Sequence, residues 1–331
     1  MRRTNSPGLR IVFASLVAVL LPCLAHAQVP IDLSMILSPK VNDFTIFGEI
    51  STNQYPTKDV EGQASKVGLS EYRLTIAHQL WNSDSEEWLL LANYRRMGLN
   101  TDAILPITGA SVPDNLENFN VGLGYRRIYD SGALFGSLIQ LGSASDQPFD
   151  SSDEVYVIGN VFVQVPFKED DGWLFALNIN SNRFIPVLPG VAYHRIRPKY
   201  DAVVGIPFVD ARFHPTEKIS VKVSYVPINA VYTELSYSVT ENTSVFTSFE
   251  WREFFFTRAN RMDDDVLLEY DEKRLATGLR FLLPRVGRIT LSGGYAFDRT
   301  IGEGDDVSSR NANEIEIGDA VFINIVYQAG F

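Results

Sequence analysis

The sequence Val321-Phe-Ile-Asn-Ile-Val-Tyr-Gln-Ala-Gly-Phe331 alternates between two kinds of side chain. In a β-strand, residues two apart lie on the same face. One face of this segment is apolar and carries Ile323, Ile325, Tyr327, Ala329 and Phe331. The other face carries Asn324, Gln328 and Gly330, with Val326 as its apolar exception. Such a strand suits a barrel whose outer surface meets lipid and whose lumen meets water.

The same segment resembles the last strand of bacterial outer-membrane proteins, which commonly ends in Phe and is read by the barrel-assembly machinery. The resemblance implies that Phe331 and Tyr327 act as an assembly signal. It also implies two partners, the assembly machinery and outer-membrane lipid, and a location in the bacterial outer membrane.

The first residues indicate export. Arg2, Arg3 and Arg10 precede the apolar run 11–24, which Ala25-His26-Ala27 follows. A basic region, an apolar region and a small-x-small site predict a signal peptide over 1–27. A membrane-anchor helix is the alternative, but the run is short and contains Pro22. Residues 28–42 are then expected to be a periplasmic lead-in, and 43–331 the barrel.

Composition excludes several classes of protein. The chain has a formal net charge of −11 and a single cysteine, Cys23, which lies inside the expected signal peptide. Disulfides are therefore not expected in the exported chain, and nucleic acid is an unsuitable partner for a chain without clustered Lys and Arg. No stretch after residue 27 has about 18 apolar residues, the length of a spanning helix. The 14 Tyr and 21 Phe suit the aromatic girdles of a membrane barrel, with a soluble β-sandwich as the alternative.

Alternating segments recur from residue 43 onward and predict an all-β chain. In 290–298, for example, Leu291, Tyr295 and Phe297 share one face, and Ser292 and Asp298 lie on the other. No long window shows the helical period. The fourteen expected strands are 43–52, 69–80, 87–97, 117–128, 133–143, 154–165, 172–181, 201–213, 218–226, 230–239, 244–256, 268–283, 287–299 and 318–331.

The links between these strands alternate mostly between short and long, which is the pattern of a transmembrane antiparallel β-barrel with short periplasmic turns and longer outer loops. An even strand number places both ends of the barrel on one side. A strand over Val187–Ile196 would break the alternation, so this segment is assigned to a loop. Barrels of twelve or sixteen strands remain alternatives.

Several short motifs then resemble one family. They are Val203-Val-Gly-Ile-Pro-Phe208, Phe213-His-Pro-Thr-Glu-Lys218, Val221-Lys-Val-Ser-Tyr-Val-Pro227, Phe249-Glu-Trp251, Tyr270-Asp-Glu-Lys-Arg274, Gly278-Leu-Arg-Phe281 and Ser292-Gly-Gly-Tyr-Ala-Phe-Asp-Arg299. Together they are similar to the DUF6268 family of outer-membrane β-barrel proteins, mainly over 187–331. The family has no assigned activity, so the resemblance implies the architecture and is silent on function.

No motif predicts an enzyme, a cofactor or a metal centre. The chain lacks the G-x-S-x-G, H-E-x-x-H and phosphate-loop patterns. His78, His194 and His214 have no Ser and acid at strand spacing. Acidic residues gather in expected outer loops, as at Asp263–Asp265, without the spacing of a calcium loop. We therefore predict no enzymatic activity, no cofactor and no metal.

Charged residues on the inner face form the candidate functional site. Strand alternation places six of them on the lumen side of three consecutive strands: Glu250, Arg252, Glu272, Arg274, Arg280 and Asp298. One interpretation is a passive or selective pore for small solutes, with this cluster as its charged constriction. The alternative is a structural or surface-interaction barrel whose lumen these ion pairs plug.

Overall fold

The computed structural model describes residues 45–330, apart from 169–170, 227–229, 260 and 262. The expected signal peptide, the lead-in and Phe331 lie outside the described residues. No helix in the described part of the chain is long and apolar enough to cross a membrane.

The long strands follow one another along the chain. They are β1 (Ile46–Gln54), β4 (Ser70–Asn82), β5 (Glu86–Gly98), β6 (Asn115–Ile128), β7 (Leu134–Ser145), β8 (Val155–Lys168), β9 (Asp171–Asn180), β10 (Val187–Arg197), β11 (Tyr200–Ile206), β12 (Val209–Thr216), β13 (Ile219–Val226), β14 (Ala230–Ser238), β15 (Thr243–Phe256), β16 (Leu267–Leu283), β17 (Gly287–Gly304), β18 (Glu314–Ile317) and β19 (Ala320–Gly330). The short elements are β2 (Lys58–Asp59), β3 (Lys66–Val67), the 3₁₀ turn η1 (Ser152–Glu154) and the helix α4 (Val307–Ala312).

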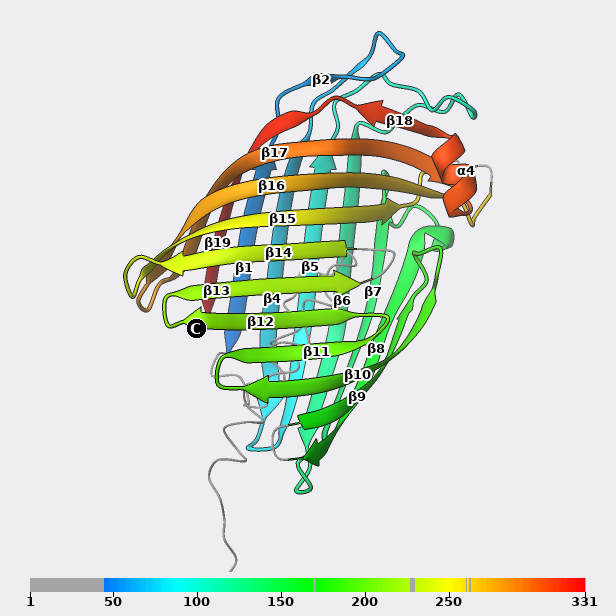
Figure 1. Ribbon diagram of the computed structural model, residues 1–331. Helices are drawn as coiled ribbons and strands as arrows, with labels where there is room; N and C mark the ends of the chain where they lie inside the picture. Colours follow the sequence, from blue (N-terminus) through cyan, green and yellow to red (C-terminus); the bar gives the residue numbers. More distant parts are fainter. Residues whose placement is uncertain (1–44, 169–170, 227–229, 260, 262, 331) are drawn as a thin grey trace, which may run out of the picture.

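The sheet closes into an antiparallel barrel (Figure 1). β1 pairs with β4 on one side and with β19 on the other, so first and last strands meet. β18 and β19 both pair with β17 and are two pieces of one interrupted strand. Counted this way, the barrel has sixteen strands. A closed barrel satisfies the backbone hydrogen bonds between neighbours, which a membrane requires.

The outward faces of the strands are apolar. Large exposed hydrophobic side chains on them include Leu74, Ile76, Phe119, Val121, Leu123, Ile139, Leu141, Leu275, Leu279, Leu291, Ile323 and Ile325. At one end of the barrel, where the links are short, the exposed aromatic residues Trp81, Trp88, Tyr129 and Tyr237 flank this band. An apolar belt with aromatic residues at its border is the lipid-facing surface of an outer-membrane barrel. We call this end the turn end, which is periplasmic in such barrels, and the opposite end the loop end.

Two strand assignments made from the sequence are wrong. Residues 187–197 form β10, which pairs with both β9 and β11, and are not a loop. The expected strand 201–213 is two strands, β11 and β12, because the chain reverses at Pro207 and Phe208. The outer link after β11 has only two residues, Pro207 and Phe208, so link length did not separate β11 from β12. The predicted antiparallel barrel is confirmed, with sixteen strands in place of about fourteen.

At the loop end, β15 crosses the barrel mouth. Among the described residues, the pairing of β14 with β15 extends to Ala230, which lies opposite Arg252. Beyond this point the chain reaches β7 on the opposite wall, where Thr257 donates its backbone N–H to the carbonyl of Ala144 over 2.7 Å. Thr257 also forms a parallel bridge with Ser145. This contact narrows the mouth and brings β15 and β7 together in space (Figure 1).

Candidate functional site

A polar cavity of about 460 Å³ lies inside the barrel. It extends from Phe254 and Phe322 in the middle of the lumen toward Arg288 and Gln328 beside the turn end. Its walls come from both sides of the barrel, with contributions from β1, β4 and β5 as well as β12–β17 and β19. Because lumen-facing residues alternate with lipid-facing ones, each strand contributes every second side chain.

At the top of the cavity, Glu71 of β4 binds two arginines. Its Oε2 accepts a hydrogen bond from Nη1 of Arg252 at 2.8 Å, and its Oε1 lies 3.1 Å from Nε of Arg95. Asn53 donates a further bond to the same carboxylate at 2.9 Å. All four side chains are buried. This group ties β1, β4, β5 and β15 together across the lumen.

Glu272 of β16 is the second centre of the network and is fully buried. The hydroxyl groups of Tyr55 and Tyr270 donate to its two carboxylate oxygens over 2.8 and 2.7 Å. Arg252 forms an ion pair with it from the neighbouring strand, and Nε of Arg299 lies 3.7 Å away. Paired and hydrogen-bonded in this way, a buried carboxylate can remain charged.

Two further ion pairs lie lower on the wall. Glu250 and Arg274 stand directly opposite each other on β15 and β16 and form a salt bridge. Arg280 binds Glu234 of β14 with two hydrogen bonds of 3.0 and 2.8 Å. The Glu250 and Arg274 pair stabilises the pairing of two neighbouring strands, whereas the Arg280 and Glu234 pair connects β16 with β14 across β15.

The structure thus places five of the six candidate residues on the lumen side, where Glu250, Arg252, Glu272 and Arg274 form one network and Arg280 lies toward the turn end. The predicted position of Asp298 on the lumen side is wrong. This residue is exposed and forms a salt bridge of 2.8 Å with Lys273 on the outer side. Two residues of β17, Asp298 and Arg299, oppose the single residue Glu272, which is a β-bulge.

The bulge reverses the facing of everything after it. Asp298 adopts a left-handed conformation with φ of 47°, which an Asp tolerates better than most residues. The extra residue shifts the alternation by one position, so the buried side chain that reaches Glu272 is Arg299. Simple alternation along 287–299 could not detect this shift.

Aromatic rings surround the arginines of the network. The guanidinium carbon of Arg95 lies 4.0 Å from the ring centre of Phe254, and that of Arg274 lies 5.1 Å from the ring of Phe322. Above them, toward the loop end, the lumen is packed with buried apolar side chains, including Leu69, Met97, Leu99, Leu116, Phe256, Leu268 and Ile301. The cavity is therefore closed on its upper side by the network and this packing.

Sequence reasoning missed Glu71, Arg95 and Arg299. The first two lie on β4 and β5, more than 150 residues before the predicted cluster, and only barrel closure brings them to Arg252. A signal was available, because Glu71 and Arg73 alternate with the apolar residues Tyr72 and Leu74. Alternation gives the face of a residue but not its neighbours across the lumen.

The structure also pairs His194 with Asp201, and the distance from Nε2 to Oδ1 is 2.5 Å. Both lie on the lumen side of β10 and β11, a hairpin that the sequence interpretation had not recognised. Among the described residues, the other ring nitrogen of His194 has no hydrogen-bond partner. No serine hydroxyl therefore completes a nucleophilic triad at this histidine within the described part of the chain.

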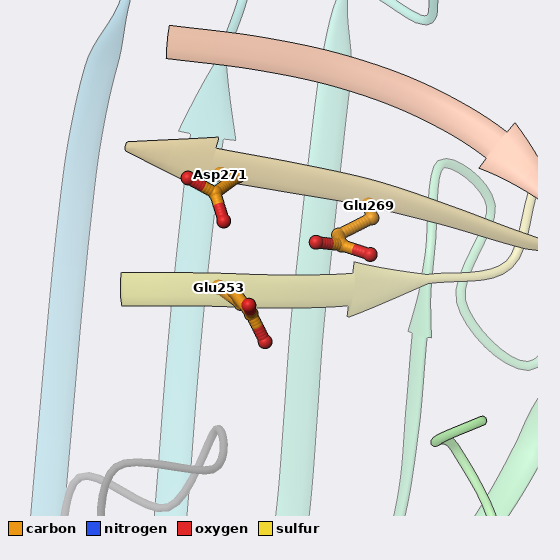
Figure 2. Close-up of side chains that lie close together, drawn as sticks. All are labelled: Glu253, Glu269 and Asp271. Atoms are coloured by element: carbon orange, nitrogen blue, oxygen red, sulfur yellow. The ribbon is translucent and has the colours of Figure 1, made fainter. Parts of the chain in front are cut away.

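Three carboxylates gather at the loop end of β15 and β16, as Figure 2 shows. Oxygen atoms of Glu253, Glu269 and Asp271 all lie within 4.8 Å of one another. Nε of Arg310 lies 3.1 Å from Glu269, and the indole of Trp251 donates to Asp271 over 2.8 Å. Because two of the three carboxylates already have these partners, we assign no ion to the cluster.

The acidic outer loops have structural partners as well. Asp306 caps α4, since its carboxylate accepts the backbone N–H of Ser309 over 2.7 Å. This hydrogen bond and the bond to the Ser309 hydroxyl hold the pKa of Asp306 below its ordinary value. These bonds order the loop after β17. Glu303 lies within β17, not in a loop, and its ion pair with Arg258 ties β17 to the link after β15.

Of the expected assembly signal, only Tyr327 lies within the described residues. It is on the outward face of β19 near the turn end, and its hydroxyl donates to the backbone carbonyl of Val286 over 2.8 Å. A tyrosine anchored at the border of the apolar belt suits a membrane interface.

Fold and lumen together define the class of this protein, an integral β-barrel of the bacterial outer-membrane type. The closed antiparallel sheet, the apolar outer belt and the polar lumen are its three criteria.

No protein-family model matches the chain, and no curated protein does. Among solved structures, it is similar to the toluene transporter TodX of Pseudomonas putida, with 8% identity, coverage of 97% and 98% of the two chains and a TM-score of 0.43. It is also similar to the COG4313 outer membrane channel of Pseudomonas putida F1, with 9% identity, coverage of 88% and 97% and a TM-score of 0.38. A third is the beta domain of the Bordetella autotransporter BrkA, with 11% identity, coverage of 86% and 99% and a TM-score of 0.33. Similarity at this level does not indicate which solute or activity this chain has.

Proposed function

We propose that this chain is an outer-membrane pore for small hydrophilic solutes, described here in a closed state. The observation that carries the proposal is the charged cavity of about 460 Å³ inside the lumen. Sixteen strands can enclose an aqueous channel, whereas narrow barrels of about eight strands are filled by side chains. A cavity of this size suits a small-molecule ligand.

Opening requires a rearrangement at the network. The route from the cavity to the loop end runs past Arg252, Glu272 and Tyr55, which are held together by hydrogen bonds. Ion pairs can exchange partners at little cost when neighbouring charges replace those lost. The lumen offers such partners, because Arg274 already lies 3.8 Å from Glu272.

The second candidate is a structural or surface-interaction barrel with a permanently plugged lumen. It is favoured by the burial of Glu71, Glu272 and Arg299 and by the apolar packing above them. In this case the network contributes rigidity, and its charges never meet a solute. The barrel would then act through its outer loops.

Conductance in planar bilayers separates the two candidates. The pore proposal expects discrete current steps from the purified barrel and more frequent opening after Glu272→Gln, which weakens the network. Arg127→Gln, in an exposed pair with Glu86 outside the lumen, is the matched control and should leave the current unchanged. Absence of current from both the folded wild type and the folded Glu272→Gln variant would support the plugged barrel.

We also propose that the chain belongs to the DUF6268 family. The supporting motifs lie mainly on β11–β17, where Phe249-Glu-Trp251 and Tyr270-Asp-Glu-Lys-Arg274 contribute to the lumen network. An alignment of family sequences tests the proposal. It fails if the alignment cannot extend over 187–331 without breaking these strands.

A further inference from the structure

The cavity is positively charged although the chain is acidic. Eight arginine and lysine side chains line it against four glutamates, an excess of four positive charges. The whole chain has a net charge of −11. Glu272 and Asp210 stand just behind the lining and reduce this excess, while Arg299 adds to it. A positive excess inside a negatively charged protein creates a local potential that attracts anions.

Two cations on the wall face each other. Arg212 of β12 and Lys222 of β13 are direct cross-strand partners, and both line the cavity. Like charges directly opposite each other destabilise a sheet. Each has an acidic cross-strand partner on its other side, Asp201 for Arg212 and Glu234 for Lys222, and Asp210 lies close enough to interact with both. Within the described residues, none of these carboxylates forms a direct ion pair with Arg212 or Lys222, whereas Arg73, Arg274 and Arg280 each have one. An anion between Arg212 and Lys222 would reduce the repulsion that remains.

Arg95, at the top of the cavity, is a further cation that lacks a full set of acceptors. It is buried, with 7% of its surface exposed, and its Nη1 has no hydrogen-bond partner among the described residues. A buried donor without an acceptor is costly. Its partner Glu71 is shared with Arg252, so Arg95 keeps a buried guanidinium nitrogen without an acceptor in the upper wall of the cavity.

We propose that the cavity selects small anionic solutes that carry carboxylate or phosphate groups, an inference that rests on the pore function proposed above. Guanidinium groups bind both oxyanions with paired, charge-assisted hydrogen bonds. Arg212 and Lys222 attract the solute from the turn end, where Arg288 also lines the cavity and binds the side chain of Gln328. Arg95 receives it at the closed upper side. Rings of Arg and Lys are the known physical basis of anion selectivity in pores.

Reversal potential across a bilayer with a KCl gradient tests the selectivity. The wild-type barrel should pass chloride more readily than potassium. The double variant Arg212→Gln with Lys222→Gln should lose most of this preference, because it removes two charges without breaking an ion pair. Lys273→Gln, on the outer surface, is the matched control and should keep the wild-type value. Current that is cation-selective, or that the double variant does not change, would overturn the inference and leave the pore function intact.

If no current is seen, anion binding can be measured through the melting temperature of the barrel. Citrate or inorganic phosphate, compared with chloride at equal ionic strength, should raise the melting temperature of the wild-type barrel in detergent. The double variant should lose this shift, while Lys273→Gln keeps it. Anion-dependent stabilisation, with no current from either the wild type or Glu272→Gln, would refute the pore and retain the anion site. No stabilisation of the wild type by either anion, together with no current from either barrel, would refute both.

Discussion

Arg252 on β15 donates to Glu71 on β4 over 2.8 Å and joins two walls of the barrel that are 181 residues apart in sequence. The same guanidinium binds Glu272 and the hydroxyl of Tyr55. One buried arginine thus holds two buried carboxylates, and the network depends on it more than on any exposed ion pair.

Arg252→Met should therefore destabilise the folded barrel strongly. Removing one partner of a buried pair leaves an uncompensated charge, which costs about 3–5 kcal/mol. Urea unfolding in detergent or lipid, followed by tryptophan fluorescence, measures the loss. The exposed pair Arg127 and Glu86 supplies the control, because Arg127→Gln should cost about 0–1 kcal/mol. Equal losses for the two variants would mean that the network contributes little to stability.

The bulge in β17 predicts that thiols at the adjacent positions 298 and 299 react at different rates. In a Cys23→Ser background, Asp298→Cys should react quickly with a membrane-impermeant maleimide, because Asp298 is exposed. Arg299→Cys should react slowly, because Arg299 is buried at 1% exposure. Heat-modified gel migration checks that both variants are folded. Faster labelling at 299 than at 298 would place the bulge elsewhere and return Asp298 to the lumen.

Opposite faces of one strand should respond differently to the same charge. Leu291 points to lipid and is 42% exposed, whereas Ser292 lines the cavity. Leu291→Arg should cost about 2–4 kcal/mol near the midplane of the membrane. Ser292→Arg should cost clearly less, since its charge enters water. Refolding yield and unfolding in lipid vesicles compare the two, and the reverse order would invert the facing of β17.

The assembly signal stays a prediction, because Phe331 lies outside the described residues. Phe331→Asp should lower the amount of folded barrel in the membrane, while Phe331→Tyr should keep it near the wild-type level, since aromatic rings suit the interface. Fractionation with heated and unheated gels measures the folded amount. Similar levels for both variants would remove the role given to this residue.

Most of the architecture could be predicted from alternation alone. The apolar face of 321–330 and the polar lumen face of 244–256 follow from a period of two, and both are present in β19 and β15. The predicted strand boundaries are wrong where two strands are joined at the loop end by a short link. Pro207 and Phe208 reverse the chain within two residues, so 201–213 resembles one strand in the sequence. The alternation of short and long links then places Val187–Ile196 in a loop, whereas these residues lie in β10.

The candidate site was predictable only in part, for a physical reason. Facing within a strand is local, so Glu250, Arg252, Glu272 and Arg274 could be assigned to the lumen from sequence. Contacts across the lumen depend on barrel closure, which no local pattern contains. A bulge is local but leaves no composition signal, and it moved Asp298 to the outer surface.

We propose that solutes pass through the cavity lined by β1, β4, β5, β12–β17 and β19. A single thiol in that cavity tests it most directly. We expect current through Ser292→Cys, in a Cys23→Ser background, to fall stepwise when an anionic methanethiosulfonate reagent is added and to recover with a reductant. Leu291→Cys on the lipid face should show no such block. Current that persists unchanged through the modified Ser292→Cys barrel, with modification verified by mass, would contradict the account.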